Sequence, residues 1–139
     1  MEANHTIKTL AILFIFAICG VSSLWAETVV DVPQPGILSS QLTTMDKNVK
    51  INGAINGSDI KYLRQQINNG FITSLNLSDA SIVSGGDAYY EEFTTNDNIV
   101  GEYMFNQCEK LEYISLPNSI TYISSKAFSK SGLKKIEIP

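Results

Sequence analysis

Apolar residues recur with the same spacing in two consecutive stretches of the C-terminal third of the chain. Residues 100–117 read VGEYMFNQCEKLEYISLP, and residues 123–139 read ISSKAFSKSGLKKIEIP. The matching columns are Val100/Ile123, Phe105/Phe128, Cys108/Ser131, Leu111/Leu133, Ile114/Ile136, Leu116/Ile138 and Pro117/Pro139. The offset between partners is constant up to the Cys108 column and shorter by one position after it, so the second copy has a single deletion. A period in the twenties predicts a solenoid, in which each unit buries its apolar face against its neighbours.

Each copy ends in the pattern L-x-x-I-x-L/I-P, which predicts a short strand. Ile114 and Leu116 point to the same side, because alternate residues of a strand share a face. Pro117 follows them and lacks an N–H, so it closes the hydrogen-bonded ladder. Phe105 and Phe128 occupy the same column, and we expect their rings to stack between consecutive units.

This unit resembles the leucine-rich repeat of BspA-like (bacterial surface protein A-like) proteins, which runs roughly I-x-x-x-A-F-x-x-C-x-x-L-x-x-I-x-I-P. Residues 119–139 fit that pattern almost throughout, apart from Ser131 at the column that usually holds Cys and the single deletion. The first copy has Met104 where Ala is usual. The resemblance implies a leucine-rich-repeat fold in an exported interaction module, which in some members of the family serves adhesion.

Residues 46–83 are predicted to form an N-terminal cap and the first repeat strand. Residues 49–53 alternate between apolar and polar types, as a short strand does. Ser58 is a good helix N-cap, and Gly70 suits the left-handed position that ends a helix. The helix between them places three apolar residues on one face: Ile60, Leu63 and Ile67. The I-N-G-x-D-x-x-x-L-R stretch also looks like the N-terminal region of exported BspA-like proteins.

Residues 72–77 carry the apolar spacing of the later strands, which makes them the first strand of the predicted solenoid. The predicted fold class is therefore an α+β repeat: a short leucine-rich-repeat solenoid with an N-terminal strand–helix cap. The predicted parts are a signal peptide (1–26), a linker (27–45), the cap with the first repeat strand (46–83), an inserted polar loop (84–98) and two leucine-rich repeats (99–139).

The N-terminal segment, 1–26, has the features of a secretory signal peptide. Lys8 gives a positive start, residues 10–19 are apolar, and a cleavage site follows Ala26. The apolar run is shorter than the roughly 20 residues that span a bilayer, which disfavours an uncleaved anchor. Lipidation at Cys19 is an alternative, although Ile18 before it is bulky for that signal. The predicted location is outside the cell, secreted or at the cell surface, with no stable membrane span after cleavage.

Two segments leave alternatives open. Residues 27–45 contain two prolines and a glycine without sustained periodicity, which favours a linker; a first strand at residues 28–32 is the alternative. The insertion at residues 84–98 places Tyr89 and Tyr90 in a polar loop, where tyrosines are common in recognition surfaces. Alternatively these rings fold back to cover the flank of the cap helix.

The composition excludes several classes of function. The net charge of −4 argues against nucleic acid as a partner. After cleavage the chain has no histidine, since His5 lies in the signal peptide, which removes Ser-His-Asp and Cys-His catalysis and histidine-bound zinc. Cys108 is then the single cysteine, expected as a buried corner residue, so no internal disulfide forms. The acidic residues of the loop lack the alternate spacing of a calcium loop. We expect no enzyme activity, no cofactor and no metal.

The polar positions of the strands are the candidate contacts for a partner. They are Asn76, Glu112, Tyr113, Ser115 and Lys135, joined by Tyr89 and Tyr90 of the loop. Tyr113 is the best anchor among them, because tyrosine is enriched at binding hot spots. The predicted function is an exported interaction module that binds a protein or glycan, with surface adhesion as one role.

The sequence ends at the end of a repeat strand, and two further expectations follow. One is that this is the N-terminal part of a larger exported protein, in which the repeats act as a spacer for a catalytic or binding domain. The other is self-association through an open C-terminal repeat edge, since an uncovered strand invites pairing.

Overall fold

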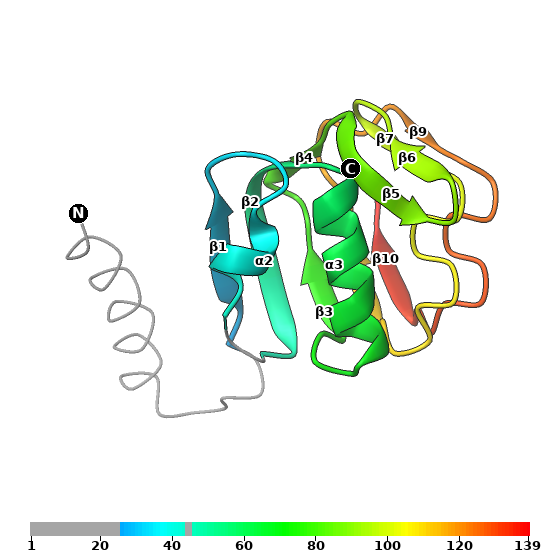
Figure 1. Cartoon of the computed structure of the whole chain (residues 1–139). Coiled ribbons are helices and arrows are strands. Elements are labelled where there is room, and N and C mark those ends of the chain that lie inside the picture. Colours follow the sequence, from blue (N-terminus) through cyan, green and yellow to red (C-terminus); the bar gives the residue numbers. More distant parts are fainter. Residues whose placement is uncertain (1–25, 44–45) are drawn as a thin grey trace.

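A parallel sheet runs from the N-terminal region into both repeats of this computed structural model, which describes residues 26–43 and 46–139 (Figure 1). Its strands follow the spatial order β1 (Thr28–Val32), β2 (Asn48–Ile55), β3 (Ser74–Asn76), β8 (Tyr113–Ser115) and β10 (Lys135–Glu137). A further strand, β4 (Ala80–Ile82), pairs with the second half of β2. Every pair in this sheet is parallel, so strands far apart in sequence extend one ladder in the same direction.

The pairing register confirms the alignment of the apolar columns. Leu75 of β3 lies opposite Ile114 of β8, and Ile114 lies opposite Ile136 of β10. Val49 of β2 extends the same row on the other side of Leu75. Residues 72–77 therefore occupy the place of a repeat strand, although the insertion makes the chain from Leu75 to Ile114 much longer than that from Ile114 to Ile136.

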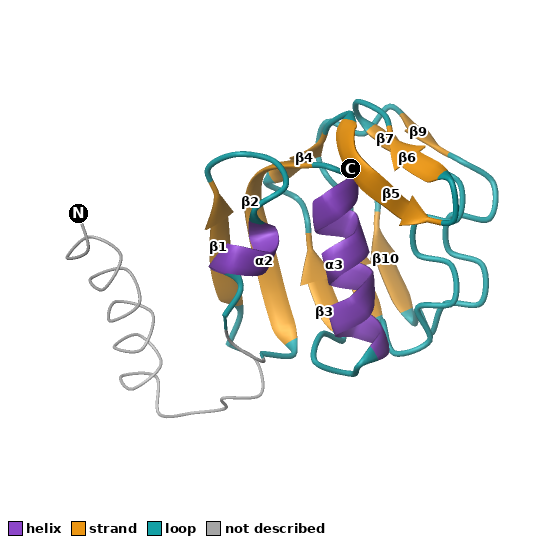
Figure 2. Cartoon of the chain, in the orientation of Figure 1, coloured by secondary structure: helices purple, strands orange, loops and turns teal. Residues whose placement is uncertain are grey.

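The helix α3 (Gly57–Asn68) lies across one face of the sheet, and the core fills the space between them (Figure 2). The three residues predicted to face the core, Ile60, Leu63 and Ile67, are fully buried. The predicted N-cap at Ser58 is wrong: Asn56 caps the helix, and its side chain accepts a hydrogen bond from the Ser58 N–H at 3.0 Å. Asp59 accepts from the Asn56 N–H at 2.9 Å, which completes a capping box. The Ser58 hydroxyl instead accepts from the Asp87 N–H at 2.9 Å.

The stretch predicted as a linker contains a strand of the sheet and a short helix. All of β1 pairs with β2, and Val30 and Val32 are buried. The short helix α2 (Leu38–Gln41) follows, with Leu38 fully buried. The alternative of a first strand is correct, because the alternating valines meet an open parallel edge on β2. The predicted signal peptide lies outside the described residues except for Ala26, and no helix within 26–43 and 46–139 is long and apolar enough to cross a membrane.

The insertion predicted as a loop is an antiparallel hairpin of β5 (Gly85–Tyr90) and β6 (Phe93–Thr95) beside α3. The turn between the strands holds Glu91 at a positive φ of 49°. The hairpin approaches the start of α3 so closely that a Cβ on Gly57 would lie 2.0 Å from the Asp87 carbonyl oxygen. Only glycine fits at that position, so the hairpin is a docked part of the fold.

The two repeat copies stack on each other. A second, two-stranded parallel sheet joins β7 (Ile99–Val100) to β9 (Tyr122–Ile123). The rings of Phe105 and Phe128 lie parallel, 5.7 Å apart at 4°, which confirms the predicted stack. Cys108 is fully buried, as predicted. The deletion in the second copy falls at Gly132, where a Cβ would lie 1.9 Å from the Glu109 carbonyl oxygen.

Candidate interaction surface

The face of the sheet that points away from α3 carries polar side chains in two rows set by the strand register. Alternate residues point to opposite faces, so the neighbours of the buried Val49–Leu75–Ile114 row point outward. We call these two rows the polar rows. One consists of Asn48, Ser74, Tyr113 and Lys135, and the other of Lys50, Asn76, Ser115 and Glu137.

Tyr113, Lys135 and Glu137 form one connected group at the end of the polar rows. The Tyr113 hydroxyl donates a hydrogen bond to Glu137 Oε2 at 2.7 Å, and Lys135 Nζ lies 2.8 Å from Glu137 Oε1. The Lys135 ammonium also lies 5.4 Å from the centre of the Tyr113 ring. The hydrogen bonds from Lys135 and Tyr113 lower the pKa of the Glu137 carboxyl. Burial, followed by the bond to Glu137, raises the pKa of Tyr113. The predicted anchor is therefore held in place by two charged neighbours.

Glu112 lies just before β8 and pairs with the second repeat. Its Oε1 accepts a hydrogen bond from Lys134 Nζ at 2.8 Å, and this bond lowers the pKa of the Glu112 carboxyl. Both side chains are more than half exposed, at 53% and 73%. Such exposed pairs contribute little to stability, so a partner could replace this contact at small cost.

The remaining predicted positions on the sheet face differ in how accessible their side chains are to a partner. Asn76 donates to Glu27 Oε1 at 3.0 Å and accepts from the N–H and the hydroxyl of Ser78 at 3.0 Å and 2.8 Å. It therefore shapes the turn after β3. Ser115 is only 7% exposed. Sequence reasoning missed Lys50, because residues 49–53 were predicted as a strand of the cap and not as a neighbour of the repeat strands. Its Nζ lies 2.6 Å from Asp79 Oδ2.

Tyr89 and Tyr90 lie on the other side of the molecule, against α3. Tyr89 is only 4% exposed, and its hydroxyl donates to the Glu102 carbonyl at 2.7 Å. Burial raises the pKa of Tyr89 to about 12. The Tyr90 ring lies 4.9 Å from the Arg64 guanidinium carbon. Both rings cover the flank of the helix, which is the arrangement that the alternative describes. Tyr89 is buried, whereas Tyr90 is half-buried, and its role as a partner contact stays a prediction.

Arg64 connects the helix to the first repeat, and sequence reasoning missed it. It is 7% exposed, and its Nη1 donates to the carbonyl oxygens of Tyr103 at 3.2 Å and Met104 at 2.8 Å. The available signal was its position at i+4 from Ile60 and i−3 from Ile67, on the buried flank of the helix.

Cys108 has no arrangement for nucleophilic chemistry. Burial raises the pKa of its thiol to about 11, although the nearby charge of Arg64 lowers it. A thiol with so high a pKa is almost entirely protonated at neutral pH and is a poor nucleophile. Within residues 26–43 and 46–139, no three side chains of His, Cys, Asp or Glu gather where they could hold a metal ion.

The repeat geometry agrees with a comparison against known families. The family model described as "BspA type Leucine rich repeat region (6 copies)" matches residues 87–139. Residues 87–139 are a BspA-type leucine-rich repeat region. The resemblance found in the sequence is thereby confirmed over both copies of the unit. No curated protein matches the chain.

The BspA-type region supplies half of the polar rows. Tyr113, Ser115, Lys135 and Glu137 lie within it, whereas Asn76 and the strands β1 to β3 precede it. The rows nevertheless continue without a change of register from the matched region into the N-terminal strands. A leucine-rich repeat indicates a module for protein interaction and is typical of non-catalytic proteins.

Proposed function

We propose that this protein is an exported module that binds a partner protein on the polar rows of its parallel sheet, with adhesion at the cell surface as its setting. The observation that carries this is the register, which aligns Tyr113 and its charged neighbours with polar residues of two preceding strands. Repeat strands stacked in register support a short solenoid, for which residues 46–83 would serve as the N-terminal cap.

The chemistry of the polar rows suits a protein surface. They combine a half-buried tyrosine with exposed charges of both signs at Lys135 and Glu137, and the exposed pair of Glu112 and Lys134 lies just before the same strands. Tyrosine provides a large contact area with a polar end, and it is enriched where interfaces gain most of their energy. Lysine and glutamate at the rim would select partners of complementary charge more than they would add affinity.

A photo-crosslinking amino acid in place of Tyr113 would identify the partner on the surface where the protein acts. Tyr113→Ala should then weaken binding of that partner by about tenfold, which corresponds to about 1.4 kcal/mol. Tyr122→Ala is the matched control, since Tyr122 is 61% exposed but lies on β9, outside the polar rows. Equal losses in both variants, or none at Tyr113, would contradict the proposal and favour a spacer role.

Export by cleavage after Ala26 has its own test. The mature protein would begin at Glu27, whose carboxylate accepts the hydrogen bond from Asn76 on the sheet face. N-terminal sequencing of the protein recovered from outside its cells should therefore start at Glu27. A start at Met1, or a lipid on Cys19, would show a different route to the surface.

A further inference from the structure

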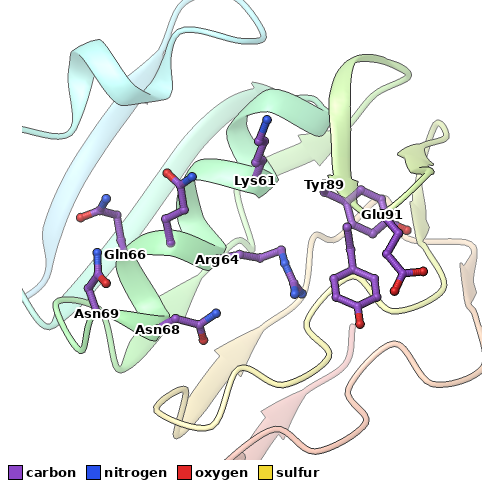
Figure 3. Close-up of a pocket in the computed structure, with 9 residues that line it drawn as sticks. Lys61, Arg64, Gln66, Asn68, Asn69, Tyr89 and Glu91 are labelled. Atoms are coloured by element: carbon purple, nitrogen blue, oxygen red, sulfur yellow. The ribbon is translucent and has the colours of Figure 1, made fainter.

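A concave surface lies along the exposed side of α3, on the opposite face of the sheet from the polar rows. One hollow of about 480 Å³ separates the helix from the end of β5 (Figure 3). A second of about 260 Å³ lies toward the start of the helix. Both are lined by Lys61 and Gln65, so they adjoin along α3. We call the combined surface the helix groove.

The wall formed by the helix carries polar groups at regular spacing. Lys61, Gln65 and Asn68 are all exposed and follow one another at i, i+4 and i+7, which places them in one stripe. The side-chain amides of Gln65 and Asn68 make no hydrogen bond with another residue within 26–43 and 46–139. Each amide offers two donors and an acceptor, the combination that a sugar hydroxyl, itself donor and acceptor, can satisfy.

The opposite wall comes from the hairpin and is fixed in position. Arg64 points from the helix toward the hairpin tyrosines (Figure 3), and its guanidinium lies over the Tyr90 ring. Arg64 is itself held in place, because it also donates to the Tyr103 and Met104 carbonyls. The Tyr90 ring that packs on it therefore has a fixed position on the hairpin side of the groove. Glu91 adds an exposed carboxylate at the turn of the hairpin.

The charges of the helix groove disfavour an anionic ligand. Its two cations, Lys61 and Arg64, are accompanied by three carboxylates: those of Asp87 and Glu91, and the buried one of Asp59, which already accepts three backbone N–H groups. Lys61 Nζ already lies 3.6 Å from Asp87 Oδ2. A polyanion would therefore meet as much repulsion as attraction along these walls.

The groove also lacks what an apolar peptide anchor requires. The apolar residues of the helix beneath it, Ile60, Leu63 and Ile67, are fully buried in the core. Peptides that bind helical or grooved surfaces normally insert apolar side chains into such places. We propose that the helix groove binds a neutral oligosaccharide through Gln65 and Asn68. This site is separate from the polar rows, so a failure of the proposed function would not affect it, and its own failure would not affect the proposed function.

The test is a titration of the isotope-labelled exported protein, followed by NMR, with five neutral probes: maltohexaose, cellohexaose, chitohexaose, xylohexaose and mannohexaose. At least one probe should shift the side-chain amide signals of Gln65 and Asn68 in a saturable way below about 10 mM, the range of weak specific binding. The Gln65→Ala/Asn68→Ala double variant should bind that probe at least tenfold more weakly.

The control is the Asn96→Ala/Asn118→Ala double variant, which removes two exposed amides outside the groove and should bind as the original protein does. Unchanged dispersion of the backbone signals shows that either variant is folded. The proposal is overturned if no probe binds, if the shifts map to the polar rows, or if only a sulfated hexasaccharide added as a charged comparison binds the groove.

Discussion

Asp59 is a buried carboxylate that joins three backbone groups from two parts of the chain. It is 1% exposed and accepts hydrogen bonds from the N–H groups of Gly36 at 2.7 Å, Leu38 at 2.9 Å and Asn56 at 2.9 Å. The first two belong to the segment after β1, and the third precedes the helix. One side chain therefore fixes the start of α3 against the N-terminal strand.

Asp59→Asn should destabilise the fold by about 2–4 kcal/mol, because an amide nitrogen cannot accept and at least one buried N–H loses its partner. The measurement is the free energy of unfolding from urea titration. Asp87→Asn is the matched control, since the Asp87 carboxylate is 69% exposed and should change stability by less than about 0.5 kcal/mol. Similar losses in both variants would contradict the role given to Asp59.

Two buried acidic groups, the Cys108 thiol and the Tyr89 hydroxyl, make the stability of the fold depend on pH in the alkaline range. Burial raises the pKa of the Cys108 thiol from 9.0 to about 11 and that of the Tyr89 hydroxyl from 10.0 to about 12. Each group holds its proton more tightly in the folded state than in the unfolded one. The stability linked to them is therefore complete below about pH 9, and it is lost as pH rises from 9 to 11 for the thiol and from 10 to 12 for the hydroxyl.

Cys108→Ala removes the titrating thiol, so the variant should lose less stability than the original protein as the pH rises from about 9 to 11. At about pH 8 the variant should be less stable than the original protein because it loses buried volume. Toward about pH 10.5 the difference between the two should shrink, by on the order of 1–2 kcal/mol. Urea titrations at both pH values measure it. A constant difference would show that the thiol does not titrate as its burial implies.

At the scale of elements, Arg64 attaches the helix to the repeat region. Arg64→Met keeps the packing of the alkyl stem but leaves the Tyr103 and Met104 carbonyls without their donor. We expect a loss of about 2–3 kcal/mol, with faster hydrogen exchange in the β5–β6 hairpin whose Tyr90 ring covers the guanidinium. Lys61→Met on the same helix is the control, because the Lys61 side chain is 51% exposed. If hydrogen exchange in the hairpin were unchanged, Arg64 would not be needed to dock the hairpin on the helix.

The repeat strands could be predicted because each column recurs within one short period. Spacing alone aligns Leu75, Ile114 and Ile136, and the register places them opposite one another. The helix follows from its apolar stripe. The first residue of the helix could not be predicted, because the N-G-S-D stretch offers several side chains that can cap a helix. The contact between Ser58 and the hairpin leaves Asn56 as the cap.

The strand β1 could be predicted only as an alternative to a linker, and the hairpin could not be predicted at all, because their signals depend on contacts distant in sequence. β1 pairs with β2 across the segment that holds α2, and no tight turn between them marks a parallel pair. The hairpin turns at Glu91, a residue type that rarely adopts a positive φ, so the usual Asn-Gly signal is missing. The outward positions of the polar rows follow from strand alternation. Ion pairs such as Lys50–Asp79 could not be predicted from strand alternation.

At the scale of the whole molecule, the sheet has two edges of different character. At the β1 edge, Val29 is 38% exposed, and Asp31 of the same strand is exposed beside it. At the β10 edge, Ile136 is 38% exposed and Ile138 is 60% exposed, because no described strand covers them. The second repeat therefore exposes apolar columns that the first repeat buries, and its edge strand has unpaired backbone groups.

A protein consisting of residues 27–139 should self-associate through that edge. Antiparallel pairing of two β10 strands about Ile136 would place Lys135 of each copy opposite Glu137 of the other, joining unlike charges along the new ladder. Ile136→Lys would put like charges at the centre of this pair, so it should shift the protein toward monomer by at least tenfold in dissociation constant. Val29→Lys, at the other edge, is the control. Sedimentation equilibrium measures both, and a monomer at about 100 μM before any substitution would rule the interface out.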